Sequence, residues 1–247
     1  MILELAGFGI ITGFISGFFG VGGGMILVPI LLLVGYVMKE AVAISIMQMV
    51  FSSIYGSILN AKHAQNVVKD GLIIGLGGFV GGLQSGYIVT NVSNESLQYL
   101  FIAILIFAII RIFYSPASYD GERKSHSKLT LFVIGAFIGL IAMSIGVGGS
   151  ILLTPILVGF MKYDLKSATA LGLFFVIFSS IAGFTSISLH GHMLYLEGAV
   201  VGIGSLIGVY FGIKAKHLVK ATSYKQYILI LNIIILVAML YKTIYSF

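Results

Sequence analysis

Stretches free of Asp, Glu, Lys and Arg divide the chain into long hydrophobic runs, and short segments between them carry the charges. A helix crosses the apolar core of a bilayer in about 20 residues, and most runs fit one such helix. Two runs are too long, because straight helices of 34 and 33 residues would each extend about 50 Å. Both carry a glycine cluster near the middle and then a proline, so we expect two short helices joined by a non-helical turn. The runs are 5–38, 41–61, 71–94, 96–110, 129–161, 167–196, 198–213 and 226–241.

The chain contains an internal repeat. The motif GVGGGMILVPIL at 20–31 matches GVGGSILLTPIL at 146–157 at a constant offset of 126 residues, and Gly75 pairs with Gly202 at an offset of 127. This pattern predicts two copies of one unit, 1–114 and 128–247, joined by a cytoplasmic linker at 115–127. We expect a hairpin at 2–38 and helices at 40–61, 70–91 and 95–114 in the first copy, then a hairpin at 128–162 and helices at 166–189, 197–217 and 224–245.

The positions of the basic residues predict the topology. If each broken run returns to the side from which it entered, 12 of the 14 Lys and Arg residues fall on one side of the membrane, and only Lys39 and Lys242 fall on the other. If each broken run crosses once, seven fall on each side. The positive-inside rule favours the hairpins, which put both termini outside the cytoplasm. The short second arms favour re-entrant hairpins over full crossings, although the charge count leaves both open.

Each unit then crosses the membrane an odd number of times, so the two units are inverted. The predicted fold class is an all-α polytopic membrane protein. It has two inverted repeats, each with a broken, glycine-interrupted hairpin and three transmembrane helices.

Composition supports a membrane protein and excludes several other classes. Of the 247 residues, 59% are hydrophobic and 9% are charged, whereas soluble domains carry about 25% charged residues. The net charge of +6 lies in short loops, which indicates membrane orientation and not nucleic-acid binding. There is no cysteine, which excludes disulfides. We find no nucleophile–base pair, P-loop or dinucleotide motif, so we expect no enzyme, no cofactor and no metal.

Paired glycine-interrupted segments in an inverted repeat indicate a transporter site at the bilayer midplane. Each turn offers backbone N–H groups, and the helix after it directs its positive dipole end at the turn. Two such turns can bind an anion without a charged side chain. The alternative is that the glycines only permit close helix packing. The candidate substrate-binding residues of the turns are Gly20, Gly22, Gly23, Gly24, Gly146, Gly148, Gly149 and Ser150.

The motif pair, the length and the repeat resemble the TauE/SafE family of sulfite and organosulfonate exporters, in the 4-toluene sulfonate uptake permease superfamily. The first motif, Gly17 to Pro29, fits closely, whereas the second has Ser150 where the first has Gly24. The resemblance covers nearly the whole chain. It implies transport of sulfite, thiosulfate or an organosulfonate such as sulfoacetate across the plasma membrane. Alternating access is expected by analogy. An anion channel of the same architecture and a membrane scaffold or enzyme subunit remain as alternatives.

Polar residues inside the apolar runs extend the candidate site. Ser45 and Gln48 share one helix face, Gln84 lies on the next helix, and Thr169 lies in the equivalent region of the second unit. Their hydroxyls and amides can donate to an oxyanion, or can form hydrogen bonds between helices. No Asp or Glu lies deep in a run, which argues against a cation path. The expected partners are a small anion and the bilayer, and the sequence leaves the oligomeric state open.

Two histidines are repeat-related. His63 and His190 end equivalent helices at an offset of 127 residues. Histidine changes charge near neutral pH, so both are candidates for gating or proton transfer. The alternative is an interfacial histidine without such a role.

Overall fold

The computed structural model describes residues 2–20, 22–60, 68–114, 127–161, 163, 165–216, 218 and 221–245, and these form helices without any strand. The predicted all-α architecture is therefore confirmed. The helices are α1 (Ile2–Phe19), α2 (Gly24–Leu33), α3 (Met38–Asn60), α4 (Val68–Gly82), α5 (Ser85–Asn91), α6 (Asn94–Tyr114), α7 (Lys128–Ser144), α8 (Ser150–Gly159), α9 (Leu165–Leu189), α10 (Tyr195–Lys216) and α11 (Ala221–Tyr245).

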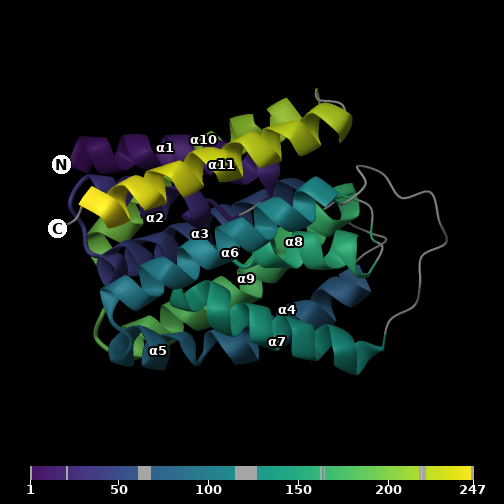
Figure 1. The fold of residues 1–247 in the computed structure, drawn as a ribbon, viewed down its shortest axis with the longest axis horizontal. Helices are drawn as coiled ribbons and strands as arrows, with labels where there is room; N and C mark the ends of the chain where they lie inside the picture. The colour runs from purple at the N-terminus through teal and green to yellow at the C-terminus, as the bar shows by residue number, and fades with distance from the viewer. Residues whose placement is uncertain are drawn as a thin grey trace.

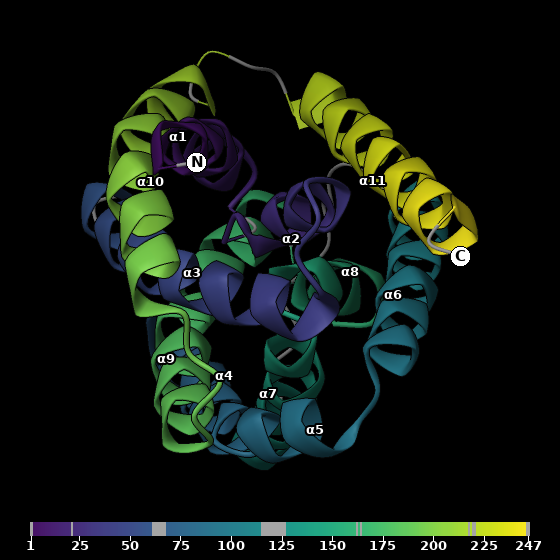
Figure 2. The same ribbon diagram turned by 90° about the vertical axis from the view of Figure 1, so that its left-hand side faces the viewer.

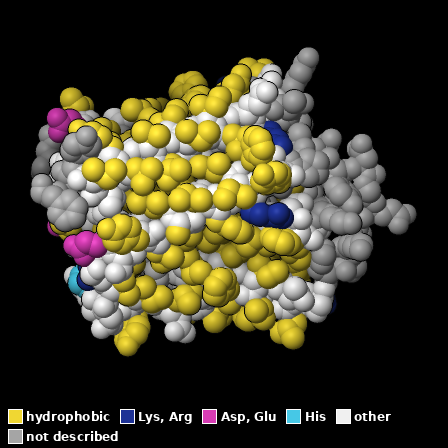
Figure 3. All heavy atoms as spheres, in the orientation of Figure 1, with side chains coloured by type: hydrophobic (Ala, Val, Ile, Leu, Met, Phe, Trp, Pro, Cys, Tyr) yellow, Lys and Arg dark blue, Asp and Glu magenta, His cyan; other side chains and the backbone are white. Residues whose placement is uncertain are grey.

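The outer surface is that of a multi-pass membrane protein. Hydrophobic side chains cover the face seen in Figure 3, with acidic groups at the end where the termini lie and most of the visible basic groups nearer the other end. Large apolar side chains on α6 and α11, such as Ile110 and Ile234, are exposed, as expected of helices that face lipid. Six spans are long and apolar enough to cross a membrane: Ile2–Phe19, Met38–Leu59, Lys69–Asn91, Asn94–Tyr114, Tyr195–Lys216 and Lys225–Ile244.

Both long hydrophobic runs are broken at their glycine clusters. α1 ends at Phe19 and α2 begins at Gly24, while α7 ends at Ser144 and α8 begins at Ser150. The second arms have 10 residues each, so they are about 15 Å long, or half of the apolar core. Residues of α1 and of the segment after α2 line one common pocket, so the first run turns back towards its starting side.

Helices from the two halves pack in a reciprocal arrangement. α1 packs along α10 and α7 packs along α4, while α3 contacts α10 and α9 contacts α4. α3 and α9 also contact each other, and they lie between these outer pairs (Figure 2). The chain begins and ends at the same end of the molecule, whereas α7 begins at the opposite end (Figure 1).

Glycines allow the outer pairs to approach closely. A Cβ atom added to Gly13 or Gly208 would overlap a backbone carbonyl oxygen across the α1–α10 contact, and one added to Gly81 or Gly139 would do so across the α4–α7 contact. Membrane helices use small residues in this way, because van der Waals contact between backbones replaces the missing hydrophobic driving force. Both contacts thus depend on glycine on each of their two helices.

One expected helix differs in detail from the structure. The span at 70–91 is divided into α4 and α5, with a break at Leu83 and Gln84. The break follows Gly81 and Gly82, two residues of low helix propensity. The hydroxyl of Ser85 donates to the carbonyl oxygen of Gly82 over 2.7 Å, which satisfies one of the acceptors that the interrupted helix leaves.

Candidate functional site

The two glycine turns have the same backbone conformation. In the first turn Gly20, Gly22 and Gly23 have φ values of 69°, 81° and 81°, and the glycines at 146, 148 and 149 have values of 69°, 76° and 59°. This left-handed region is open to glycine and costly for residues with a Cβ atom. The turns therefore require glycine at these positions for conformational reasons, whatever else they bind.

The structure brings the two turns into direct contact. A Cβ atom on Gly24 would overlap the carbonyl oxygen of Gly146, and one on Gly146 would lie 3.0 Å from the Cα atom of Val42. The half-helices α2 and α8 begin at these turns, so their positive dipole ends lie close together. Sequence positions more than 100 residues apart thus meet in one region that joins both halves.

Gln48 is buried beside the first turn. Its side chain is fully buried, and neither its amide nitrogen nor its amide oxygen has a hydrogen-bond partner within the described parts of the chain. A Cβ atom on Gly23 would lie 2.7 Å from Nε2 and 2.8 Å from Oε1 of Gln48, so the amide head lies directly against the turn. A buried amide without a partner costs roughly 1–3 kcal/mol, and a polar ligand at the turn would remove this cost.

Serine hydroxyls on α3 hold both turns. Ser45 donates to the carbonyl oxygen of Gly146 over 2.5 Å, and Ser52 donates to that of Gly22 over 3.3 Å. Both side chains are fully buried. Ser45 therefore lies among the candidate site residues, but its hydroxyl proton is used within the protein. We interpret the two serines as groups that position the turns.

The other polar candidates lie elsewhere. Gln84 is exposed at the break between α4 and α5, so the structure does not bring it to the turns. His190 is exposed at the end of α9, with Nδ1 2.7 Å from the carbonyl oxygen of Ser186. The side chain of Thr169 and the whole of His63 lie outside the described residues. The gating role of the two histidines stays a prediction.

Two polar residues near the second turn were not singled out in the sequence. Thr154 and Asn232 are buried, at 5% and 1% exposure, and line a small cavity together with Ser150. Thr154 lies one helical turn after Ser150 on α8, and Asn232 is the amide in the interior of the apolar run 226–241, which Gln226 begins. An amide inside an apolar run was the sequence feature that could have identified Asn232 as a candidate.

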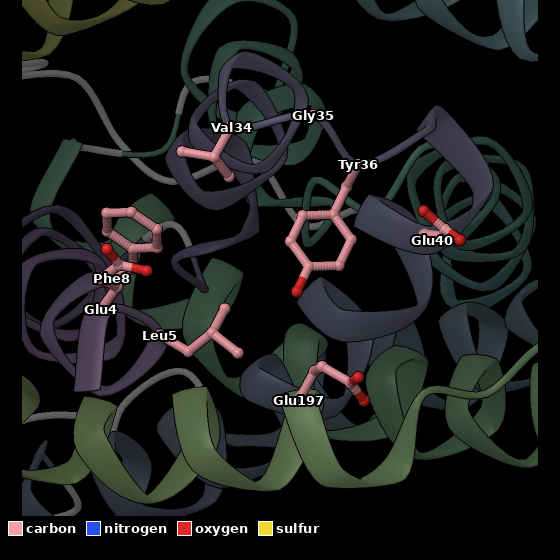
Figure 4. Close-up of a pocket in the computed structure, with 8 residues that line it drawn as sticks. All are labelled: Glu4, Leu5, Phe8, Val34, Gly35, Tyr36, Glu40 and Glu197. Atoms are coloured by element: carbon pink, nitrogen blue, oxygen red, sulfur yellow. The ribbon is translucent and has the colours of Figure 1, made fainter. Parts of the chain in front are cut away.

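A larger pocket of about 880 Å³ opens at the end of the molecule that holds the termini. Glu4, Glu40 and Glu197 line it, and the ring of Tyr36 points towards Glu197 (Figure 4). Burial, and then the charges of Glu197 and Glu40, raise the pKa of Tyr36 above its ordinary value. Three carboxylates make this pocket unfavourable for an anion, so we place the candidate site at the glycine turns. Within the described ranges, no group of three or more His, Asp or Glu side chains is arranged to hold a metal ion.

Comparison with known proteins identifies the family. Residues 5–239 match the family model described as "Sulfite exporter TauE/SafE". The "Probable membrane transporter protein YunE" of Bacillus subtilis (strain 168) is 23% identical, over 96% of this chain and 97% of its own. The "Probable membrane transporter protein ORF9" of a Sinorhizobium species is 26% identical, over 93% and 88% of the two chains. No solved structure matches the chain significantly.

The names of these relatives and the extent of the family match indicate a membrane transporter. They are named as transporters and not as enzymes, which is consistent with the expectation of a non-enzyme. The family match covers both glycine turns and all six apolar spans except the start of the first and the end of the last. The chain therefore belongs to the TauE/SafE family of membrane transporters.

Proposed function

We propose that this transporter moves small sulfur-containing anions, such as sulfite, thiosulfate or an organosulfonate, across the plasma membrane. The anion would bind where the two glycine turns meet, held by backbone N–H groups at the starts of α2 and α8 and by the amide of Gln48. The observation that carries the proposal is the buried Gln48 head group, which lies against Gly23 without a partner. The amide nitrogen of Gln48 is a buried donor without an acceptor, and an anion at the turn would supply that acceptor.

The electrostatics of the turns support an anion. Both half-helices begin there, and each helix N-terminus carries about half a positive charge. The fully buried polar residues of the described chain are Ser, Thr, Asn and Gln, and no carboxylate is among them. An anion in this region would therefore meet positive dipole ends and neutral donors, and no buried negative charge would oppose it.

We also propose that the two units are inverted repeats that alternate access to the site. Three features support this: the reciprocal helix packing, the matching turn angles, and the opposite starting ends of α1 and α7. An inverted pair can exchange conformations between its halves, which generates inward- and outward-facing states of similar energy. The two turns pack against each other, so that a Cβ atom on Gly24 would overlap the carbonyl oxygen of Gly146, and this contact favours a carrier over a permanently open channel. Saturable flux would distinguish the two.

The orientation follows from charge. We propose that the basic end faces the cytoplasm and that both termini lie outside it, since basic residues concentrate on the cytoplasmic side. The absence of cysteine makes a labelling test straightforward. Ser96 and Ser127, which are both exposed, mark the starts of α6 and α7 at opposite ends. In intact cells an impermeant maleimide should label Ser96→Cys but label Ser127→Cys only after permeabilisation. The reverse pattern would overturn the orientation.

The substrate class is tested by ligand-induced stabilisation of the purified wild-type protein. The panel contains sulfite, thiosulfate, sulfate, sulfoacetate, taurine and chloride as sodium salts at matched ionic strength. A ligand at 100 times its Kd adds about 2.7 kcal/mol, enough for a visible rise in melting temperature. We expect a rise with at least one sulfur anion and none with chloride. An equal response to chloride, or no response to any sulfur anion, would contradict the proposal.

A further inference from the structure

The small cavity beside the second turn carries a more specific inference. It lies between α8 and α11, and Met25 of α2 and Ile112 of α6 also line it. The space available to the centre of a water-sized sphere is about 10 Å³, which holds about one water molecule or one group of that size. The cavity is thus too small for a whole sulfur oxyanion, but it adjoins Ser150 at the start of α8.

Three buried oxygen atoms in its wall have no hydrogen-bond partner in the described parts of the chain. They are Oγ of Ser150, Oγ1 of Thr154 and Oδ1 of Asn232. No charged side chain lines the cavity, and the rest of its wall is apolar. Because unpartnered buried polar atoms are costly, this cluster points to a ligand group that would satisfy them.

The orientation of Asn232 specifies what kind of group fits. Its Nδ2 atom donates to the carbonyl oxygen of Ile228 over 2.7 Å, which fixes the amide with Oδ1 as the unpartnered atom. A carbonyl-type oxygen only accepts hydrogen bonds, so a bare oxyanion oxygen would be repelled. A hydroxyl group fits, because it can donate to Asn232 and accept from the hydroxyl of Thr154.

Position links this cavity to the anion site. Ser150 belongs to the second turn, and Thr154 follows it by four residues on the same face of α8, about 6 Å along the axis. An anionic group at the turn would therefore adjoin the cavity that Asn232 lines. The first half offers no equivalent on its half-helix, since Gly24 and Val28 occupy the positions of Ser150 and Thr154 at the offset of 126 residues.

We propose that Ser150, Thr154 and Asn232 form a subsite that binds a hydroxyl group carried by the transported anion. This inference rests on the proposed function, because the glycine turns supply the site for the anionic end. Asn232 then acts as a specificity-determining residue, which favours anions with a donor a few atoms from the charge.

Two sulfonates that differ in one group provide the test. Ethanesulfonate and isethionate (2-hydroxyethanesulfonate) share the anionic end, and only isethionate carries a hydroxyl donor. We would measure both Kd values for the purified wild type, for Asn232→Leu and for Thr154→Val, which replaces the hydroxyl by a methyl group of the same shape. Thr243→Val is the matched control, because the Thr243 hydroxyl on α11 already donates to the carbonyl oxygen of Met239.

In the wild type and in Thr243→Val, isethionate should bind about tenfold more tightly than ethanesulfonate, as one added buried hydrogen bond predicts. In Asn232→Leu and Thr154→Val the ratio should fall to about one, with ethanesulfonate unchanged. Equal binding in the wild type, no binding of either sulfonate, or a ratio that survives both substitutions would overturn the subsite. The cavity would then hold only a structural water. Sulfite binding that still depends on Gln48 would leave the proposed function intact in that case, and its loss would remove both.

Discussion

The two glycine turns share a backbone and differ in the side chains that face them. At the first turn the amide of Gln48 lies against Gly23, whereas at the second the ring of Phe175 lies against Gly149. Gln48 and Phe175 are 127 residues apart, so they occupy equivalent positions on α3 and α9. The repeat thus keeps the conformation of the turn and changes its chemistry.

The two halves also differ in where serine and glycine lie at the contact between turn and helix. Ser45 on α3 packs against Gly24, while in the other half Gly172 on α9 packs against Ser150. Serine and glycine have exchanged places between turn and helix, so each contact keeps one small hydroxyl residue. The two turns thus have matching backbone conformations and similar side-chain volumes, whereas their polar groups differ. An asymmetric ligand is what an asymmetric set of donors and acceptors can recognise.

The largest expected effect is a loss of stability at the two glycine-lined helix contacts, α4–α7 and α1–α10. Gly81→Ala and Gly208→Ala place a Cβ atom against a backbone carbonyl oxygen, of Ala136 and of Ile10 respectively. Backbone atoms cannot move aside cheaply, so each substitution should lower the free energy of unfolding by about 3 kcal/mol. Thermal melts in detergent should show similar losses for both. A large loss in one and none in the other would show that the α4–α7 and α1–α10 contacts are not equivalent.

The turns themselves should respond unequally. Both Gly23 and Gly149 have positive φ, but an added Cβ atom meets a flexible amide at the first and the buried Phe175 ring at the second. We expect Gly149→Ala to cost about 2 to 3 kcal/mol and Gly23→Ala about 1 to 2 kcal/mol. Melting temperatures of the two variants provide the comparison. Equal losses would mean that backbone strain alone sets the cost.

The smallest effect concerns two equivalent serines. Ser52 donates to the carbonyl oxygen of Gly22 in the first turn as well as to that of Met49, whereas Ser179 donates, among the described residues, only to Phe175 and Val176 of its own helix. Ser52→Ala should therefore cost about 1 kcal/mol, and Ser179→Ala close to zero. A loss in Ser179→Ala as large as that in Ser52→Ala would show that the hydroxyl contact to the turn has no value of its own.

Strong local signals explain what could be predicted from the sequence. Runs without charge gave the apolar spans, and the glycine clusters followed by Pro29 and Pro155 gave the helix breaks. These features act within a few residues, so a single sequence contains them. The division of the span at 70–91 was not predicted, because glycines in membrane helices more often serve packing than breaks.

The candidate site was less accessible to sequence reasoning, because it depends on which helices meet. Gln48 and Gln84 both lie within apolar runs, yet one is buried against a turn and the other is exposed. Depth along a run does not reveal which face of a helix points inward. Asn232 and Thr154 line one cavity although they lie 78 positions apart in the chain. No local pattern encodes that juxtaposition.

Under the proposed function, Gln48 lacks a partner within the described protein because its partner is the transported anion. The most direct measurement is the affinity for sulfite of the wild type, Gln48→Leu and the matched control Gln84→Leu, together with their melting temperatures without ligand. Because Gln48 makes no hydrogen bond to the described protein, its replacement should leave stability unchanged or raise it, while sulfite affinity falls at least about tenfold. Gln84→Leu should retain wild-type affinity. Unchanged sulfite affinity in folded Gln48→Leu would contradict the account.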